Sequence, residues 1–231
     1  MRTKSWITAA LLPAGVLAFW MNASAQLVDC TGATITCATF TEGRLKLKPA
    51  LSPNACPPGV TDLISIRGTF SDCTLTGAGT VRVVSGALRG SISTPDCTCA
   101  ELPLGAHPTL GGSLTTTWKF ATADAMGNAL ALCTEKVSTL VLSPAARVAV
   151  EELGPGPLEA IPMDSIHAIY GVLSLNGTGL SVSGPFQGED GGTTSVFTAI
   201  TTESVEDIAG SCLGPKKLTG FRFGQAEIQL K

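Results

Sequence analysis

The chain has 231 residues, of which 44% are hydrophobic and 14% are charged, and its formal net charge is −3 at pH 7. This length is sufficient for a sizeable core in one β domain or in two small ones. A mildly acidic chain is a poor electrostatic match for nucleic acid or for an anionic membrane surface, which argues against both as partners.

The N-terminal segment has the three-part layout of a secretory signal peptide. Arg2 and Lys4 precede an apolar stretch over residues 6–19, and the small-x-small sequence ASA at 23–25 forms a cleavage site. The apolar stretch is shorter than the roughly 20 residues that span a bilayer, and no later segment is long and apolar enough to do so. We therefore expect an exported protein, located in the periplasm, at the cell surface or outside the cell.

Cleavage after residue 25 leaves 13 basic residues (15 less Arg2 and Lys4) and 18 acidic residues, a net charge of −5. A competing interpretation of the same region is a lipoprotein anchored at Cys30. Asp29 argues against it, because small residues are expected at the position before a lipidated cysteine.

The rest of the chain shows an all-β pattern, in which short stretches of alternating polar and apolar residues are separated by Gly, Pro, Asn and Asp. The branched residues that dominate these stretches suit a pleated, half-buried surface. We expect a disulfide-stapled antiparallel β-sandwich or open barrel. The predicted strands are, in chain order, 33–40, 44–48, 62–70, 80–84, 87–93, 113–122, 129–142, 146–151, 166–175, 179–183, 185–187, 193–200 and 218–230.

One motif, VSGxxxG, occurs twice among these strands, as VSGALRG at 84–90 and as VSGPFQG at 182–188. In each copy the Ser-Gly pair is typical of a tight turn between two strands, which places Leu88 or Phe186 on the buried face. Two interpretations stay open: generic hairpin sequences, or an old duplication that produced two related β halves. Such halves would meet in the Pro- and Gly-rich stretch 143–165 of an otherwise single domain over 26–231.

A single short helix is predicted over residues 204–212. Ser204 can cap this helix, with Asp207 three residues further on, and the apolar face that follows ends in Cys212, which would point into the core.

The last strand changes its alternation part-way along. Phe221 and Phe223 share one parity, whereas Ile228 and Leu230 have the other. The change falls at Gly224, so we expect a β-bulge there that returns the apolar side chains to the core.

All the cysteines follow the predicted signal peptide, and their even number in an exported chain predicts disulfides whose pairing the sequence does not define. The two cysteines of the CTC sequence at 97–99 are one residue apart, whereas zinc sites use a two-residue spacing and a second pair of ligands. We therefore predict disulfides and no metal site. The eight candidates are Cys30, Cys37, Cys56, Cys73, Cys97, Cys99, Cys133 and Cys212.

Four segments carry a resemblance: GPFQGEDGGTTSVFTA at 184–199, the helix that ends in cysteine, the KKL closing strand and GTFSDC at 68–73. They resemble a group of exported bacterial proteins, common in actinobacteria, that are described as uncharacterised secreted proteins. The resemblance covers most of residues 27–231. It implies an extracytoplasmic β fold and brings no catalytic residues.

The sequence offers few groups for catalysis. It has neither a G-x-S-x-G nucleophile motif nor a Gly-rich phosphate loop. Its two histidines, His107 and His167, lie in no catalytic motif, although Asp164 precedes His167 by three residues. Adjacent carboxylates at 151–152 would point to opposite faces of a strand, and those at 189–190 are typical of a solvated turn. We predict no catalytic, cofactor or metal residues.

Carbohydrate binding through aromatic stacking is also poorly supplied. Trp118 is the only tryptophan after the predicted signal peptide, and it shares parity with Phe120 on a predicted strand. A large ring with an apolar partner normally packs inward, so we expect Trp118 in the core.

These observations favour a non-catalytic envelope or extracellular protein that acts as a structural, adhesion or partner-binding module. Its partner would be a cell-envelope component or another protein. The alternative is a secreted hydrolase built from dispersed acids and His167. A cleft that holds His167 or His107 beside Asp164 would favour the hydrolase, and a groove or patch without histidine would favour binding.

Overall fold

The computed structural model describes residues 25–51, 53, 60–95, 105–108, 110–144, 147–152, 170–176, 180–188, 195–215 and 217–231. These residues form an antiparallel β fold with one short helix, α1 (Val205–Leu213), as predicted. The strands are β1 (Leu27–Val28), β2 (Thr34–Leu51), β3 (Asp62–Thr76), β4 (Val83–Thr94), β5 (Gly105–Pro108), β6 (Gly111–Phe120), β7 (Leu132–Cys133), β8 (Val137–Leu142), β9 (Arg147–Glu152), β10 (Tyr170–Asn176), β11 (Leu180–Ser183), β12 (Val196–Ser204) and β13 (Leu218–Leu230).

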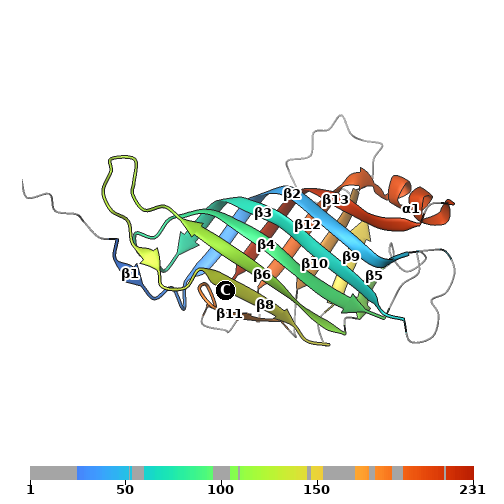
Figure 1. Ribbon diagram of the computed structural model, residues 1–231, viewed down its shortest axis with the longest axis horizontal. Coiled ribbons are helices and arrows are strands. Elements are labelled where there is room, and N and C mark those ends of the chain that lie inside the picture. The colour runs from blue at the N-terminus through green and yellow to red at the C-terminus, as the bar shows by residue number, and fades with distance from the viewer. Residues whose placement is uncertain are drawn as a thin grey trace, which may run out of the picture.

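One sheet contains eleven of these strands, in the order β11-β8-β6-β4-β3-β2-β13-β12-β10-β9-β5. All its neighbours are antiparallel, whereas β1 and β7 form a separate parallel pair. The long strands β2, β3, β4 and β6 run diagonally side by side, with α1 at one end (Figure 1). Strands from both sides of the 143–165 stretch therefore build one continuous sheet.

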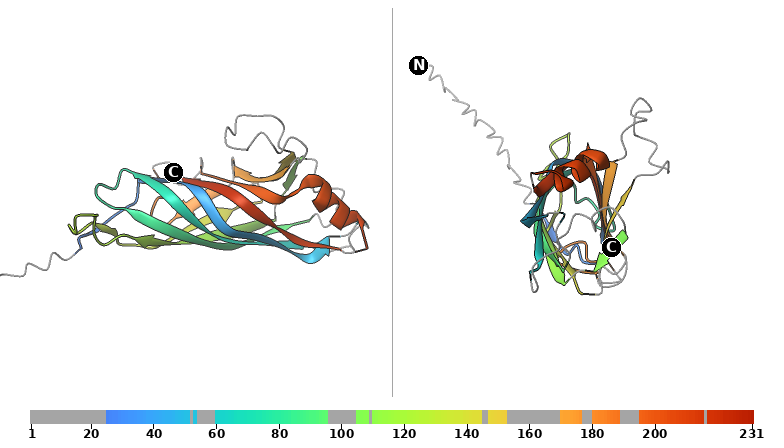
Figure 2. Two further views of the ribbon diagram at one scale, coloured as in Figure 1. Left: turned by 90° about the horizontal axis from the view of Figure 1, so that it is seen from above. Right: turned by 90° about the vertical axis from the view of Figure 1, so that its right-hand side faces the viewer.

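The sheet curls around its long axis. Leu142, which ends β8, and Arg147, which begins β9, are five positions apart in the chain, so they lie at most about 18 Å apart. On a flat sheet, β8 and β9 would be about 38 Å apart, because eight strand spacings of ~4.8 Å separate them. The two edges must approach each other, as the end view in Figure 2 shows. Among the described residues β11 and β5 do not pair, so the sheet is an open barrel.

Aromatic side chains fill the interior of the curled sheet. The ring centroids of Phe40 on β2 and Phe70 on β3 lie 4.6 Å apart. Both rings also meet Phe197 on β12 edge-on, with centroids 6.2 Å away. Because β13 separates β2 from β12 in the sheet, these contacts cross the interior. All three side chains are fully buried.

Glycines on the inner face make room for these rings. A Cβ atom on Gly68 would collide with the ring of Phe40, and one on Gly43 would lie 2.5 Å from Cε1 of the same ring. At both positions, a side chain would point into the core and meet the ring of Phe40. The absence of a side chain at these two positions is therefore a packing requirement of the core.

Trp118 on β6 is buried, with 2% of its surface exposed, which confirms its predicted place in the core. Its ring meets Phe186 edge-on, with centroids 5.3 Å apart. Its Nε1 donates a hydrogen bond to Oγ of Ser138 (2.8 Å), and that hydroxyl donates to the carbonyl oxygen of Pro185 (2.5 Å). The indole therefore satisfies its one polar group inside the protein.

The two copies of VSGxxxG have different structures, although both contact Trp118. The Ser-Gly pair of the first copy lies within the continuous strand β4, so the predicted turn there is wrong. A Cβ on Gly86 would collide with the ring of Trp118, which explains the glycine. The second copy does form a turn after β11, with positive φ at Gly184 and Phe186, but the predicted strand over 185–187 is absent. Leu88 and Phe186 are both buried, as predicted.

The predicted β-bulge in the last strand is confirmed. Ile200 on β12 pairs with Gln225, and the next residue, Thr201, pairs with Phe223, so Gly224 is the extra residue. Phe223 before the bulge and Ile228 after it are both buried, as the change of alternation requires.

The helix also agrees with its prediction. Ser204 is the N-cap, and its Oγ accepts a hydrogen bond from the backbone N–H of Asp207 (3.0 Å). The same Oγ donates to the Asp207 carboxylate at 2.8 Å. Cys212 is buried at the other end of the helix.

Other predicted strands differ from the structure in their limits. The predictions over 33–40 and 44–48 merge into β2, whose register shifts by a bulge between Thr41 and Arg44. The prediction over 129–142 divides into β7 and β8, and β1 and β5 were not predicted. Short edge pairings such as these contain too few residues to show an alternation.

Candidate binding surface on the outer face of the sheet

The strands at the centre of the sheet place their basic side chains on the outer face. On β2, Leu45 and Leu47 point into the core, and Arg44, Lys46 and Lys48 alternate with them and are exposed. The two-residue period of a strand causes this separation, because successive side chains point to opposite faces.

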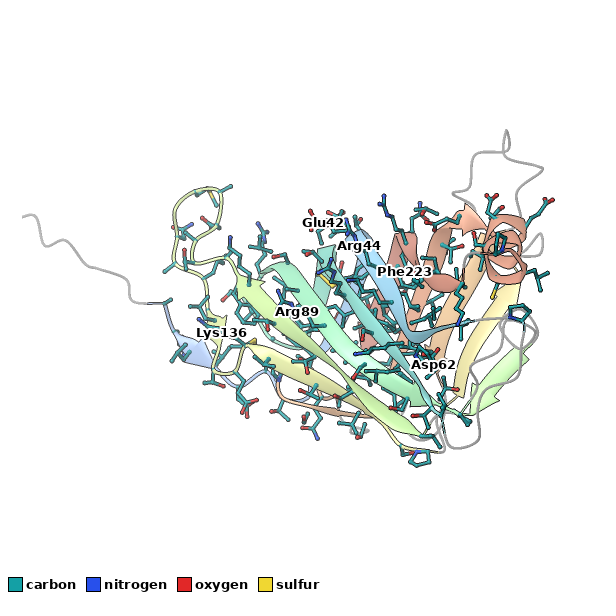
Figure 3. The ribbon with its side chains drawn as sticks, turned by 45° about the vertical axis from the view of Figure 1, so that its right-hand side comes forward. Glu42, Arg44, Asp62, Arg89, Lys136 and Phe223 are labelled. Carbon is teal, nitrogen blue, oxygen red and sulfur yellow. A yellow bond between two sulfur atoms is a disulfide. The ribbon has the colours of Figure 1, made fainter. Side chains whose placement is uncertain are left out.

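Four arginines from four adjacent strands lie in one line across this face. In the strand register, Arg222 on β13 pairs with Arg44 on β2, Arg44 pairs with Arg67 on β3, and Arg67 pairs with Arg89 on β4. We call this set the arginine row. All four side chains are exposed. Figure 3 labels two of its members, Arg44 and Arg89, on strands separated only by β3.

The arginine row opposes folding. Like charges that face each other directly across strands are destabilising, by up to about 1 kcal/mol for each pair. Four of the seven arginines of the chain are in this row. Within the described residues, none of the four guanidinium groups forms an ion pair with a carboxylate. In that part of the chain, no carboxylate therefore neutralises the row.

Among the described residues, two acidic ones lie close to the row: Glu42, two positions before Arg44 on β2, and Glu203, at the end of β12. Glu203 contacts the row through a backbone group. Its Oε2 accepts hydrogen bonds from the backbone N–H of Arg222 (3.1 Å) and from Oγ1 of Thr202 (2.9 Å). The Glu203 carboxylate thus contacts the main chain of Arg222 and forms no ion pair with its guanidinium group.

Two shallow hollows lie over the arginine row. One, of about 520 Å³, lies over β13 and β2, and the other, of about 320 Å³, lies over β2, β3 and β4. Arg44, Lys46 and Ser65 line both, so the hollows adjoin. Gly220 lines the first one, and its φ of +148° and the close backbone of Leu45 exclude a side chain at this position.

Hydroxyl groups flank the row on the same face. Ser65 on β3 and Ser91 on β4 lie two positions from Arg67 and Arg89, and they pair with each other. Ser91 also pairs with Ser113 on β6. On the other side of the row, Thr69 on β3 and Thr117 on β6 occupy the equivalent outward positions. The arginine row therefore lies between hydroxyl groups on β3, β4 and β6, with Lys46 on β2 beside Ser65.

Asp62, at the start of β3, is a buried acid close to one end of the same strands. Its Oδ1 accepts a hydrogen bond from the backbone N–H of Lys48 (3.0 Å), and only 1% of the residue is exposed. Burial raises the pKa of this carboxyl, and the backbone hydrogen bonds from Lys48 and Leu63 offset part of that rise. Figure 3 shows Asp62 well separated from Arg89, so it is not part of the row.

Of the histidines and acids considered from the sequence, the structure describes only the placement of His107 and of the acids at 151–152. The sequence GAHP around His107 is typical of a loop, but His107 lies in β5, at the edge of the sheet. His167 and Asp164 lie outside the described residues, as do the acids at 189–190. The acids at 151–152 end β9. Within the described part of the chain, no group of three His, Cys, Asp or Glu side chains could hold a metal.

Two disulfides are present in the described residues. Cys30 is bonded to Cys133, and Cys37 is bonded to Cys73 directly across β2 and β3. The sulfur of Cys30 is therefore not available for the thioether that the lipoprotein interpretation requires. Cys212 is disulfide-bonded as well, whereas the remaining three candidates, Cys56, Cys97 and Cys99, lie outside the described residues.

The arginine row was not found from the sequence. The signal that could have indicated it is an arginine beside a glycine or a large apolar residue in four strands, in GRL, IRG, LRG and FRF. Each of these arginines is predicted to point outward by alternation alone. Only the register of distant strands, which the sequence does not reveal, brings them into one line.

Comparison with known proteins gave no match: no protein-family model, no curated protein and no solved structure matches this chain. Any assignment of function to the chain therefore depends on the geometry of the outer face.

Proposed function

We propose that this protein is an exported, non-catalytic binding module that holds an anionic extracellular partner through the arginine row. The observation that carries the proposal is the alignment of four exposed guanidinium groups across β13, β2, β3 and β4, none of which forms an ion pair with a carboxylate of the described residues. Folding alone gives no reason to place like charges opposite one another. An anionic partner gives one, because it removes the repulsion and gains charge-assisted hydrogen bonds.

Disulfides support the extracellular location. The pairs Cys30–Cys133 and Cys37–Cys73 are typical of oxidising compartments. The resemblance to exported bacterial proteins and the signal peptide predicted over residues 1–25 agree with the same location. No helix in the described residues has the length and apolar character needed to cross a membrane.

The net charge of the chain, which argued against nucleic acid and anionic membranes at the level of the whole sequence, does not describe the outer face of the sheet. The value of −3 averages over the whole sequence, whereas binding depends on the local field. Charged side chains on one face of four strands create that local field even when acids elsewhere outnumber them.

Retention on the envelope of the cells that export the protein tests the proposal. The variant with Arg44→Gln and Arg67→Gln loses two central charges of the row, and we expect it to wash off at a much lower salt concentration than the wild type. The control with Arg82→Gln and Lys136→Gln loses two exposed charges elsewhere and should be retained like the wild type. Equal retention of the row variant and the wild type would overturn the proposal.

A further inference from the structure

We propose that the arginine row binds a linear acidic polysaccharide that lies across the strands, with its acidic sugar units facing successive guanidinium groups. This inference rests on the proposed function and deepens it by naming the class of partner. The direction, the spacing and the chemistry of the row each support this class of partner.

The spacing of the row suits a regular polymer. Neighbouring strands lie about 4.8 Å apart, so the three intervals from Arg222 to Arg89 span about 14 Å. The sugar units of an extended polysaccharide repeat at a similar interval. A chain with one carboxylate or sulfate on each unit would then place its acidic groups beside successive arginines.

The chemistry of the guanidinium group suits carboxylates and sulfates. Its planar array of N–H donors forms paired hydrogen bonds to two oxygen atoms of such a group. Lys46 and Lys48, which are exposed on the same face of β2, add positive charge next to Arg44. The row can therefore hold a polyanion by charge and by directed hydrogen bonds together.

The neighbours of the row suit sugars. Ser65, Ser91 and Ser113 on one side, and Thr69 and Thr117 on the other, offer hydroxyl groups to the hydroxyl groups of a sugar chain. These residues are neutral and small, so they leave the two hollows open to a ligand that crosses several strands.

The same surface is less suited to other polyanions. Proteins that bind single-stranded nucleic acid combine basic grooves with exposed aromatic rings on which bases stack. Among the residues whose side chains the structure describes, the exposed large hydrophobic ones are leucine, valine and methionine, and Trp118 is buried. Membrane-surface binding joins basic residues to a contiguous apolar face, whereas hydroxyl groups flank this row. The sequence argued against carbohydrate binding through aromatic stacking. An acidic sugar can bind through charge and hydrogen bonds without such stacking.

Titration calorimetry with oligosaccharides of defined length tests the inference. The probes are linear oligouronates and sulfated heparin oligosaccharides, each with two, four and eight sugar units. We expect affinity to rise strongly from two to four units, which fill the row, and only weakly from four to eight. A neutral dextran oligosaccharide should not bind. Binding of only the uronates, or of only the sulfated chains, would support the inference and show whether the row prefers carboxylate or sulfate groups.

Matched variants connect binding to the row. We expect Arg67→Gln to weaken binding of the four-unit chain by about tenfold or more, because a hydrogen bond to a charged group contributes at least that much. The dependence of log affinity on log salt should become less steep by about one. Arg82→Gln, which removes an arginine outside the row, should leave both quantities unchanged.

Three results would overturn the inference. One is equal affinity for two-unit and four-unit chains. Another is tighter binding of a single-stranded oligodeoxynucleotide, or of vesicles containing anionic lipid, than of either oligosaccharide. The third is loss of binding in both arginine variants alike. The first two results would leave the proposed function standing if the row variant still failed to be retained on the envelope, so the two failures are distinguishable.

Discussion

The two faces of the central strands differ in what constrains their residues. On the inner face, each side chain depends on its neighbours: Phe40 fits only because Gly68 has no side chain, and Trp118 depends on Gly86 in the same way. On the outer face, Arg44 and Arg67 are exposed and oppose each other. The inner face is therefore determined by packing, whereas the arginine row of the outer face lowers stability and requires an explanation outside the fold.

The largest expected effect that sharpens this comparison is on the inner face. We expect Gly68→Ala to lower the free energy of unfolding by about 3 kcal/mol, because the added Cβ collides with the ring of Phe40, which is buried against Phe70 and Phe197. Urea denaturation measures this change.

The matched control is Gly210→Ala on the exposed side of α1, where a Cβ would meet nothing within 4 Å. It should stabilise the protein by up to about 1 kcal/mol, since alanine favours a helix more than glycine does. A Gly68→Ala protein as stable as the wild type would show that the ring of Phe40 is not packed tightly against β3.

The second prediction concerns the buried hydrogen bonds of Trp118. Ser138→Ala removes the acceptor of the indole N–H and the donor to the Pro185 carbonyl, and should lower the free energy of unfolding by about 1–3 kcal/mol. The outer-face control Ser91→Ala should change it by less than about 0.5 kcal/mol. Equal losses of stability in Ser138→Ala and Ser91→Ala would contradict the difference in packing between the inner and outer faces.

A smaller, pH-dependent effect is expected at Asp62. Burial raises its pKa in the folded protein, so this residue favours folding most at a pH below the pKa of an unfolded Asp, and that contribution is lost as the pH rises through the folded pKa. Asp62→Asn removes the charge and keeps a side-chain oxygen that can accept the hydrogen bond from the backbone N–H of Lys48. We expect the variant to be more stable than the wild type at pH 7 and equal to it at low pH. A difference in stability that does not change with pH would contradict this account.

The sequence predicted those features that depend on neighbouring residues. The bulge at Gly224, the Ser204 cap and the buried Trp118 all follow from alternation or from a local motif. The turn predicted at Gly86 is wrong because the reason for that glycine is the ring of Trp118, which lies on another strand. The arginine row escaped prediction for the same reason, since it arises from the register of four strands. Local pattern thus defines which face a residue occupies, and register defines what lies beside it.

The most direct test of the claim that the arginine row serves binding and not folding is the thermal unfolding of the free protein. The variant has all four row residues, Arg44, Arg67, Arg89 and Arg222, changed to glutamine, and both proteins are compared at low and at high salt. We predict that the variant unfolds at the same temperature as the wild type or above it, with the larger advantage at low salt, where repulsion between the arginines is least screened. A variant that unfolds well below the wild type at both salt concentrations would show that the row holds the sheet together, and would contradict the account.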